Sequence, residues 1–274
     1  MRLASSTAIL AVLLASCTLT EDPPAPYTPN ALGNGSRIAD IQNPSSATYQ
    51  QALADAVASA TNGGVNPGVN VSISSAVVSW IDTFDETKDG KSVGTVYVQD
   101  IGSSAPYSGT SLYEPSYVPA SLRLLPGDVL DLAGPYQEQP KIGTAVFTAP
   151  DTLPSLYKPV GTYRYDFTTP TPVVVQISDL DQSNYAAGRK WEGMLVTVND
   201  ITLGPGVDVS NRVTYIIGQG DAAIDLNAVA ISNELYDLSS TQFPAGQHFS
   251  SVTGIVTWFY SYQIAPRSPA DLKP

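Results

Sequence analysis

Short apolar stretches that alternate with polar residues run through most of this 274-residue chain, and Gly, Pro, Asn or Asp interrupt them repeatedly. An alternation with a period of two is typical of strands with one buried face, and the turn residues keep each strand short. Several short strands in this arrangement predict an all-β sandwich or barrel. The clearest examples are residues 69–73, 95–98, 129–132, 173–177 and 195–198.

One short helix is predicted around residues 49–60. Thr48 and Gln51 have the spacing of a capping box, with Thr48 as the N-cap, and the segment 62–64 is suited to end the helix. The apolar face would consist of Leu53, Val57 and Ala60. Because this face is small, we expect the helix to be an insertion that lies on a barrel and not a core element.

A weak internal repeat links the two halves of the chain. The β segments 95–99 and 214–219 are each followed by a turn glycine and then by a second β segment with a glycine inside it, at Gly134 and Gly254. A glycine inside a strand suits a bulge that bends the strand around a barrel corner. We therefore expect the two glycines to occupy equivalent places in two related β units, although a chance similarity within one larger β domain is the alternative.

The repeat sets the expected domain boundaries. A first β domain would occupy residues 37–140 and a second one residues 191–274, with a proline-rich connection at 141–190. Residues 17–36 are rich in proline and poor in large apolar groups, so they are expected to form a tether.

The N-terminus has the pattern of an export signal. An arginine at position 2 precedes an apolar run that is too short to span a bilayer, which is typical of a signal peptide over residues 1–16. The segment Leu14-Ala15-Ser16-Cys17 resembles the bacterial lipobox, and the resemblance implies a diacylglycerol on the thiol of Cys17 after cleavage. Thr18, where an Asp often marks inner-membrane retention, favours the outer membrane. An ordinary secretory signal is the alternative.

Cys17 is the one cysteine of the chain, so no intramolecular disulfide can form and the fold must depend on its core. The formal net charge is −12, with 25 acidic and 13 basic residues. Such a charge repels polyphosphates over long range, which disfavours non-specific binding of DNA or RNA.

Five segments are notable for their order along the chain: 37–42, 94–100, 125–129, 191–198 and 263–268. Together they resemble the OB-fold region that accompanies bacterial extracellular nucleases and also stands alone in some surface lipoproteins. The resemblance implies one or two tandem OB-like Greek-key barrels, each small and closed. In those nucleases the catalytic residues lie in a separate metal-dependent domain, which this sequence lacks, so no catalytic residue carries over.

No pattern of catalytic or metal-ligating residues is present in the sequence. The one histidine, His248, has no nucleophile motif to serve and is expected to be a structural or surface residue at the start of a strand. One histidine and one lipidated cysteine cannot supply the usual zinc ligands. The acidic segments 82–90 and 179–183 depart from the calcium-loop spacing and are expected to be solvated loops. The sequence therefore predicts no cofactor, no metal site and no enzymatic activity, although spatially paired carboxylates are invisible to it.

The aromatic residues are candidates for a binding face, because bases and sugars stack on exposed aromatic rings of OB folds. The residues concerned are Tyr97, Tyr113, Trp258, Tyr260 and Tyr262, of which the last three would lie on one face of a single strand. The alternative is that these rings cover the barrel and stabilise its strands.

These observations predict a non-enzymatic lipoprotein of the cell envelope, held to the membrane by its lipid and carrying OB-like modules that bind another macromolecule. The ligand would be a protein, a glycan or a single-stranded nucleic acid. The alternatives are a nucleic-acid-binding accessory to an extracellular nuclease and a glycan-binding module.

Overall fold

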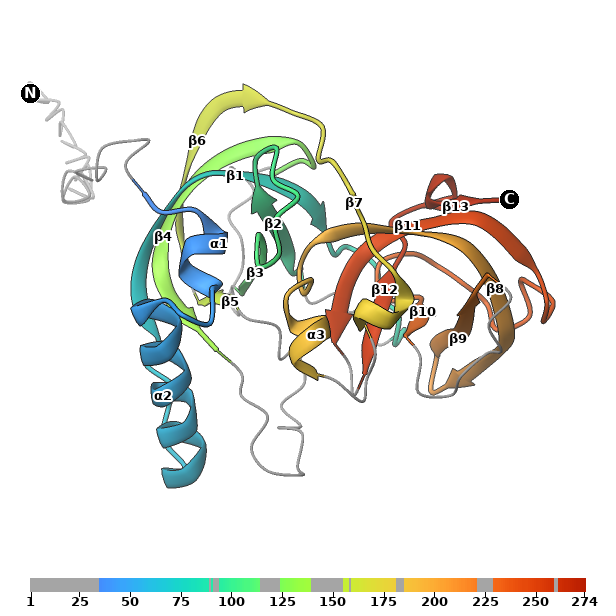
Figure 1. The fold of residues 1–274 in the computed structure, drawn as a ribbon, viewed down its shortest axis with the longest axis horizontal. Coiled ribbons are helices and arrows are strands. Elements are labelled where there is room, and N and C mark those ends of the chain that lie inside the picture. Colours follow the sequence, from blue (N-terminus) through green and yellow to red (C-terminus); the bar gives the residue numbers. More distant parts are fainter. Residues whose placement is uncertain are drawn as a thin grey trace, which may run out of the picture.

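The chain folds into two β-barrels that pack side by side, as the computed structural model in Figure 1 shows. The structure describes residues 35–88, 90, 94–113, 124–138, 155–157, 159–180, 185–220, 229–258 and 261–274. Strands predominate over helices in this part of the chain. The prediction of an all-β barrel fold is confirmed.

Five strands close into the first barrel. β1 pairs with β2, β2 with β3, β3 with β5 in parallel, β5 with β4, and β4 pairs back with β1. This order, with one parallel pair between the third and fifth strands, is that of an OB-like Greek-key barrel. The strands are β1 (Val69–Ile81), β2 (Val96–Asp100), β3 (Gly109–Tyr113), β4 (Asp128–Gln137) and β5 (Ser155–Tyr157).

The second barrel repeats the order and the directions of the first. Its first strand pairs with its second and its fourth, and its third and fifth strands again run parallel. The tandem OB-like arrangement expected from the sequence is therefore present in the strand pairing. The strands are β8 (Leu195–Val209), β9 (Arg212–Gln219), β10 (Ala230–Ser232), β11 (His248–Trp258) and β12 (Tyr262–Ala265).

A sixth strand follows each barrel and pairs with the beginning of its fourth strand. In the first unit this strand is β6 (Val160–Phe167), and in the second it is β13 (Leu272–Lys273). Both β5 and β6 lie within residues 141–190, which were predicted from the sequence to be a connection between the two β domains. Because β5 completes the first ring, the first unit extends to the end of β6.

The repeat also includes the segments that precede the barrels. Ser36 pairs in parallel with β1, and β7 (Val173–Val174) pairs in parallel with β8. A short helix comes next in each unit, α1 (Ile38–Gln42) in the first and the 3-10 helix η1 (Ile177–Leu180) in the second. The two units therefore share this entry segment and its short helix as well as their barrels.

Gly134 and Gly254 occupy equivalent places, but neither has a positive φ. Gly134 lies opposite Val71 of β1 and Gly254 opposite Val196 of β8. A Cβ atom would lie 3.0 Å from the Pro159 Cα at the first position and 2.6 Å from the Ala265 carbonyl oxygen at the second. The expected bulge is absent at both positions. Glycine is needed because the chain that leaves the fifth strand passes close to the fourth.

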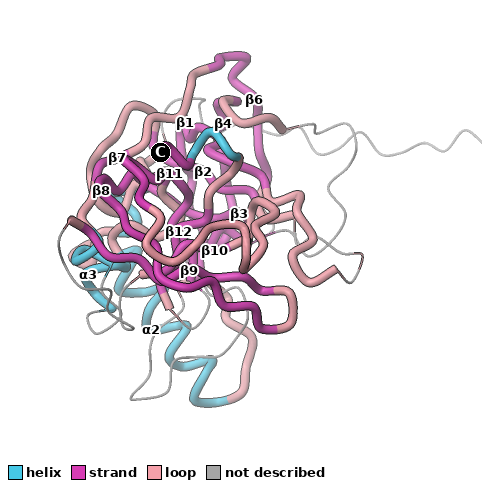
Figure 2. Tube along the Cα trace, turned by 90° about the vertical axis from the view of Figure 1, so that its right-hand side faces the viewer, coloured by secondary structure: helices cyan, strands magenta, loops and turns pink. Residues whose placement is uncertain are grey.

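The predicted helix is present as α2 (Ala47–Asn62), and Figures 1 and 2 show it projecting away from the strands. Its N-cap is Ser46, whose hydroxyl accepts the Tyr49 amide at 3.0 Å, and not Thr48. Its buried residues are Ala52 and Ala56 instead of the expected apolar face, because small side chains let the helix lie close to β1 and β4. The C-cap Gly63 is left-handed, as expected.

The remaining helices of the described residues are short. They are α3 (Tyr185–Arg189) and the 3-10 helix η2 (Pro269–Asp271). None of the helices in the described ranges is both long and apolar enough to cross a bilayer.

Each barrel has its own core, and the first barrel also contributes to the core of the second. Val96, Val98 and Leu112 point into the first barrel, whereas Tyr97, on the other face of β2, belongs to the core cluster of the second. Trp80, opposite Tyr97 on β1, packs against that same cluster. The outer face of β1 and β2 is therefore covered by the second barrel.

Hydrogen bonds and close backbone contacts seal the junction between the barrels. The buried Gln99 side chain of β2 accepts the Leu195 amide at 3.2 Å and donates to the Thr171 carbonyl at 3.1 Å. A Cβ atom on Gly109 of β3 would lie 2.6 Å from the backbone nitrogen of Met194. In an OB-like barrel the second and third strands form the usual ligand face. In the first barrel this face is occupied by the second barrel.

Candidate ligand-binding site on the second barrel

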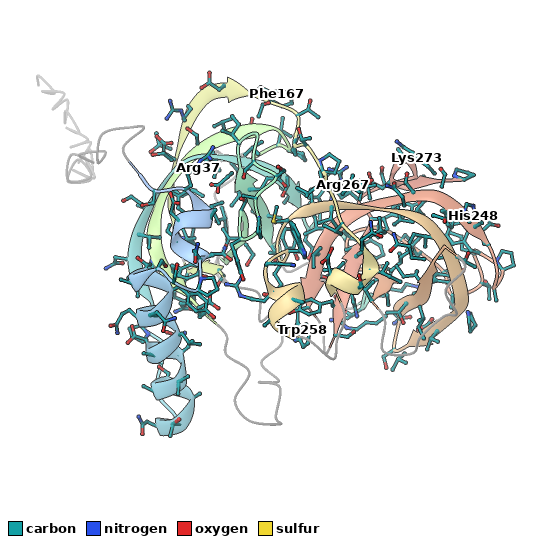
Figure 3. All side chains as sticks on the ribbon, viewed as in Figure 1. Arg37, Phe167, His248, Trp258, Arg267 and Lys273 are labelled. Carbon is teal, nitrogen blue, oxygen red and sulfur yellow. The ribbon has the colours of Figure 1, made fainter. Side chains whose placement is uncertain are left out.

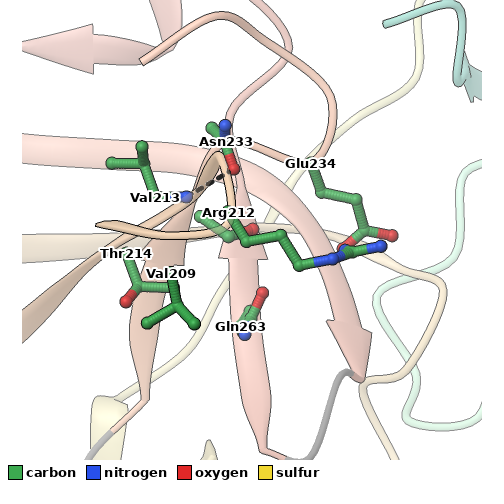
Figure 4. Close-up of a pocket in the computed structure, with 8 residues that line it drawn as sticks. Val209, Arg212, Val213, Thr214, Asn233, Glu234 and Gln263 are labelled. Atoms are coloured by element: carbon green, nitrogen blue, oxygen red, sulfur yellow. Dashed lines mark hydrogen bonds between the residues drawn. The ribbon is translucent and has the colours of Figure 1, made fainter. Parts of the chain in front are cut away.

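A pocket of about 290 Å³ lies on the second barrel, beside the turn that joins β8 and β9 (Figure 4). It lies on β9, β10 and β12, the second, third and fifth strands of this barrel. The lining residues are Val209, Arg212, Val213, Thr214, Ser232, Asn233, Glu234 and Gln263. The pocket therefore occupies the face that OB-like barrels use for ligands, next to the loop between their first two strands.

A tight turn shapes one side of the pocket. Ser210 and Asn211 both have positive φ values, 56° and 68°, as in a two-residue hairpin turn. The amide side chain of Asn233 accepts the Val213 amide and donates to the Asn211 carbonyl, both at 2.9 Å. Asn233 has a structural role here, because both ends of its side chain hold the hairpin.

Ser232 is a polar residue of the pocket whose hydroxyl has no internal partner. Its side chain is 3% exposed, and its hydroxyl makes no hydrogen bond. A buried hydroxyl without a partner costs free energy, so such a group calls for an explanation. Ser232 lines the pocket, so a ligand that enters deeply enough to contact its hydroxyl would give it a partner.

Glu234 provides a carboxylate that is held in place from two sides. One of its oxygens accepts the Tyr97 hydroxyl of the first barrel at 3.2 Å, and the other accepts the Thr257 hydroxyl at 2.5 Å. Burial raises the pKa of Glu234, while the hydrogen bonds from Thr257 and Tyr97 act in the opposite sense. Because both bonds are donated to the carboxyl oxygens, they favour the ionised form.

A loop of the first barrel reaches the same region and neutralises Arg212. The Glu86 carboxylate lies 3.0 Å from the Arg212 guanidinium, and the Asn211 side chain donates to the Thr87 carbonyl at 3.2 Å. Asp82 and Glu86 are only 4% and 6% exposed. The expectation that segment 82–90 is a solvated loop is therefore wrong for these two acids, since the loop packs against the second barrel.

The predicted aromatic face is not on the surface. Tyr97, Trp258 and Tyr262 are all buried, at 1%, 8% and 0% exposed. Trp258 ends β11 and Tyr262 begins β12, so the two rings pair across a hairpin, with centroids 4.7 Å apart, and do not follow one another on one strand. The three rings stabilise the second core and cannot stack on a ligand. Tyr260 and the side chain of Tyr113 lie outside the described residues.

The other predicted positions have no part in the pocket. His248 begins β11, at the opposite end from Trp258 (Figure 3), and its side chain is 54% exposed with Nε2 2.8 Å from an Asp200 carboxylate oxygen. Asp179 lies 3.5 Å from the ammonium of Lys190. Within the ranges that the structure describes, no group of three or more His, Cys, Asp or Glu could hold a metal. Cys17 lies outside the described residues.

A second polar cluster is buried where the two units meet. The Arg189 guanidinium of α3 forms an ion pair with Glu138, donates to Gln42 Oε1 at 2.9 Å and to the Tyr136 hydroxyl at 3.1 Å. The nearest oxygen of Glu192 is 3.5 Å from Arg189, and neither of its oxygens has a hydrogen-bond partner. This cluster connects α1 and β4 of the first unit to the segment that leads into the second.

Neither polar site was predicted from the sequence. Ser232, Glu234 and Arg212 come together only through the strand order, so no local signal marks them. The full extent of the repeat had a signal, because residues 37–41 (RIADI) resemble residues 176–180 (QISDL). The two segments become α1 and η1. In each helix a first-turn amide donates to the side chain of the last residue in the second strand of the same unit, which is Asp100 in β2 and Gln219 in β9.

Comparison with models of known protein families and with curated proteins gives no match for the chain. The resemblance to the nuclease-associated OB-fold region stays a prediction. The proposed function therefore depends on the chemistry of the pocket.

Proposed function

We propose that this protein is a non-enzymatic binding protein of the cell envelope, anchored by a lipid on Cys17, in which the second barrel binds another macromolecule. The observation that carries the proposal is the pocket on β9, β10 and β12 with the buried, unpartnered hydroxyl of Ser232. The ligand face of the first barrel is occupied by the second barrel, so the two barrels have different roles. The first holds the second and shapes one side of its ligand face.

A blocking substitution on the pocket tests the binding role. Thr214 of β9 lines the pocket, and Thr214→Trp should fill it without altering the core. The full-length chain, purified in detergent, would be screened against immobilised glycans, single-stranded DNA and peptides. Any ligand found should lose at least about tenfold in affinity for Thr214→Trp, which corresponds to roughly 1.4 kcal/mol.

Thr162→Trp serves as the matched control, because Thr162 is an equally half-buried strand threonine that does not line the pocket. Affinity should be unchanged in this variant. Equal losses in both variants, or a ligand whose affinity neither variant changes, would contradict a binding role for the pocket.

The location in the cell envelope is tested separately by fractionating cells. Recovery of the chain only in the soluble fraction would contradict it.

A further inference from the structure

Some polar groups of the pocket already have hydrogen-bond partners within the protein, and the hydroxyl of Ser232 has none. The side chain of Asn233 is engaged at both ends, and the carboxylate of Glu234 accepts two hydroxyls from the protein. Ser232 keeps a hydroxyl without any partner, and Thr214 lines the same space. From this distribution we infer that the pocket binds one sugar unit of a neutral glycan, which deepens the proposed function and rests on it.

The hydrogen-bonding chemistry of the pocket matches a group of sugar hydroxyls. A hydroxyl both donates and accepts, so it can pair with the hydroxyl of Ser232 or of Thr214. The Glu234 carboxylate accepts only, and each of its oxygens has lone pairs beyond the single bond that it receives. A polyhydroxylated ligand supplies the donors that these oxygens need, and it supplies acceptors for Ser232 as well.

The charges of the pocket disfavour phosphorylated ligands. Arg212 is the only cation among the lining residues, and it already forms an ion pair with Glu86 at 3.0 Å. A phosphate would meet the carboxylates of Glu234 and Glu86 and a chain of formal net charge −12. A neutral ligand meets no such repulsion.

The size and the apolar part of the pocket fit one ring of a chain of sugars. A volume of about 290 Å³ is at the lower end of small-molecule pockets. Val209 and Val213 add apolar surface, against which the C–H groups of a sugar ring can pack. Val209, at the end of β8, lines the pocket and is 65% exposed, so a longer glycan can extend past it into solvent.

The test is a titration of the full-length chain in detergent with short neutral oligosaccharides that end in glucose, galactose, mannose or N-acetylglucosamine. Ser232→Ala removes the unpartnered hydroxyl and should weaken binding roughly three- to tenfold, the effect of one neutral hydrogen bond. Ser79→Ala is the matched control, because Ser79 of β1 is also fully buried with an unpartnered hydroxyl but does not line the pocket. Its affinity should equal that of the wild type.

Sugar binding that weakens in Ser232→Ala and not in Ser79→Ala supports the inference. The absence of binding to every oligosaccharide of the panel overturns it, as does sugar binding that Ser232→Ala leaves unchanged. Single-stranded DNA (a dT oligonucleotide) and a peptide library are titrated in parallel. If either binds and Thr214→Trp blocks it, the proposed function stands and the assignment to a glycan is wrong.

Discussion

Glu192 is the residue whose surroundings are hardest to reconcile with an ionised side chain. Glu192 is 1% exposed, and its carboxyl group has no hydrogen-bond partner. Its nearest oxygen lies 3.5 Å from Arg189, which forms a closer ion pair with Glu138. Burial raises the pKa of Glu192 to about 8, against the opposing effect of Arg189. One cation and two carboxyl groups share this buried space, so a neutral Glu192 balances the charges there.

Because Glu192 is protonated in the folded protein, the protein should become less stable as the pH rises. The folded chain keeps a proton that the unfolded chain releases near pH 4.5, so the stabilisation is complete below that pH and is lost as the pH rises through about 8. Each pKa unit corresponds to about 1.4 kcal/mol, so the loss is of the order of a few kcal/mol. Glu192→Gln should remove most of this dependence in urea denaturation between pH 5 and pH 8.5 (roughly the window of the titration).

Glu138→Gln is the control for this prediction. It removes the ion pair between Arg189 and Glu138, so it should destabilise the protein by about 3–5 kcal/mol at low pH, where Glu192 is protonated. The loss should be smaller at high pH, because an ionised Glu192 lies 3.5 Å from Arg189. If wild type and Glu192→Gln lose stability equally with rising pH, Glu192 is ionised in the folded protein.

At the scale of the elements, the fourth strand of each barrel changes partner at a glycine. β4 pairs with β6 up to Ala133 and with β5 from Tyr136, and Gly134 lies between these pairings. β11 pairs with β13 at Val252 and with β12 from Ile255, on either side of Gly254. The backbone at the end of the fifth strand (Ala265) or just after it (Pro159) lies close to the glycine, and a side chain would obstruct it.

The two glycines should differ in their tolerance of alanine. A Cβ atom at Gly254 would lie 2.6 Å from the Ala265 carbonyl oxygen, whereas the closest atom at Gly134 is 3.0 Å away. Gly254→Ala should therefore destabilise the protein by roughly 1–3 kcal/mol, as overpacking does, and Gly134→Ala by less. Urea denaturation of both variants measures the difference. Equal effects, or a larger effect at Gly134, would show that the close approach is not the reason for glycine.

At the scale of the whole molecule, the two units are joined through a shared core and a shared polar cluster. Tyr97 of β2 belongs to the core of the second barrel and also donates to Glu234 in the pocket. Val98, the next residue, points into the first barrel. Neighbouring residues of one strand therefore stabilise different barrels.

Tyr97→Ala should destabilise the second barrel although the residue belongs to the first. The loss of a large buried aromatic ring costs about 3–5 kcal/mol. In hydrogen exchange, amides of β11 and β12 should exchange faster than in the wild type, by a larger factor than those of β1 and β4. Val98→Ala should give the opposite distribution, and the same pattern in both variants would contradict the shared core.

The sequence by itself determined the type of fold and the places of β1, β2, β4, β8, β9 and β11. The predicted strand at 173–177 is shorter than expected, because only Val173–Val174 forms β7 and Ile177 begins η1. The alternation of apolar and polar residues has the same period as the strand, and turn residues mark where each strand ends, so both signals are local. Gly63 as a helix C-cap, Gly134 and Gly254 as strand glycines, and His248 at the start of a strand were predictable for the same reason. The reason why these two strand positions need glycine was not predictable, because it depends on a close approach by a neighbouring segment of the fold.

Only the tertiary structure decided which outer faces are exposed and which residues form the site. A period of two shows that Tyr97 and Val98 point to opposite sides of β2, but it cannot show that a second barrel covers the outer side. The same limit made Tyr97, Trp258 and Tyr262 appear to be surface candidates. Ser232, Glu234 and Arg212 come together because β9, β10 and β12 are neighbours in the ring, and Glu86 joins them from the other unit. Contacts between distant segments depend on strand order and on packing between barrels, and neither leaves a local pattern in the sequence.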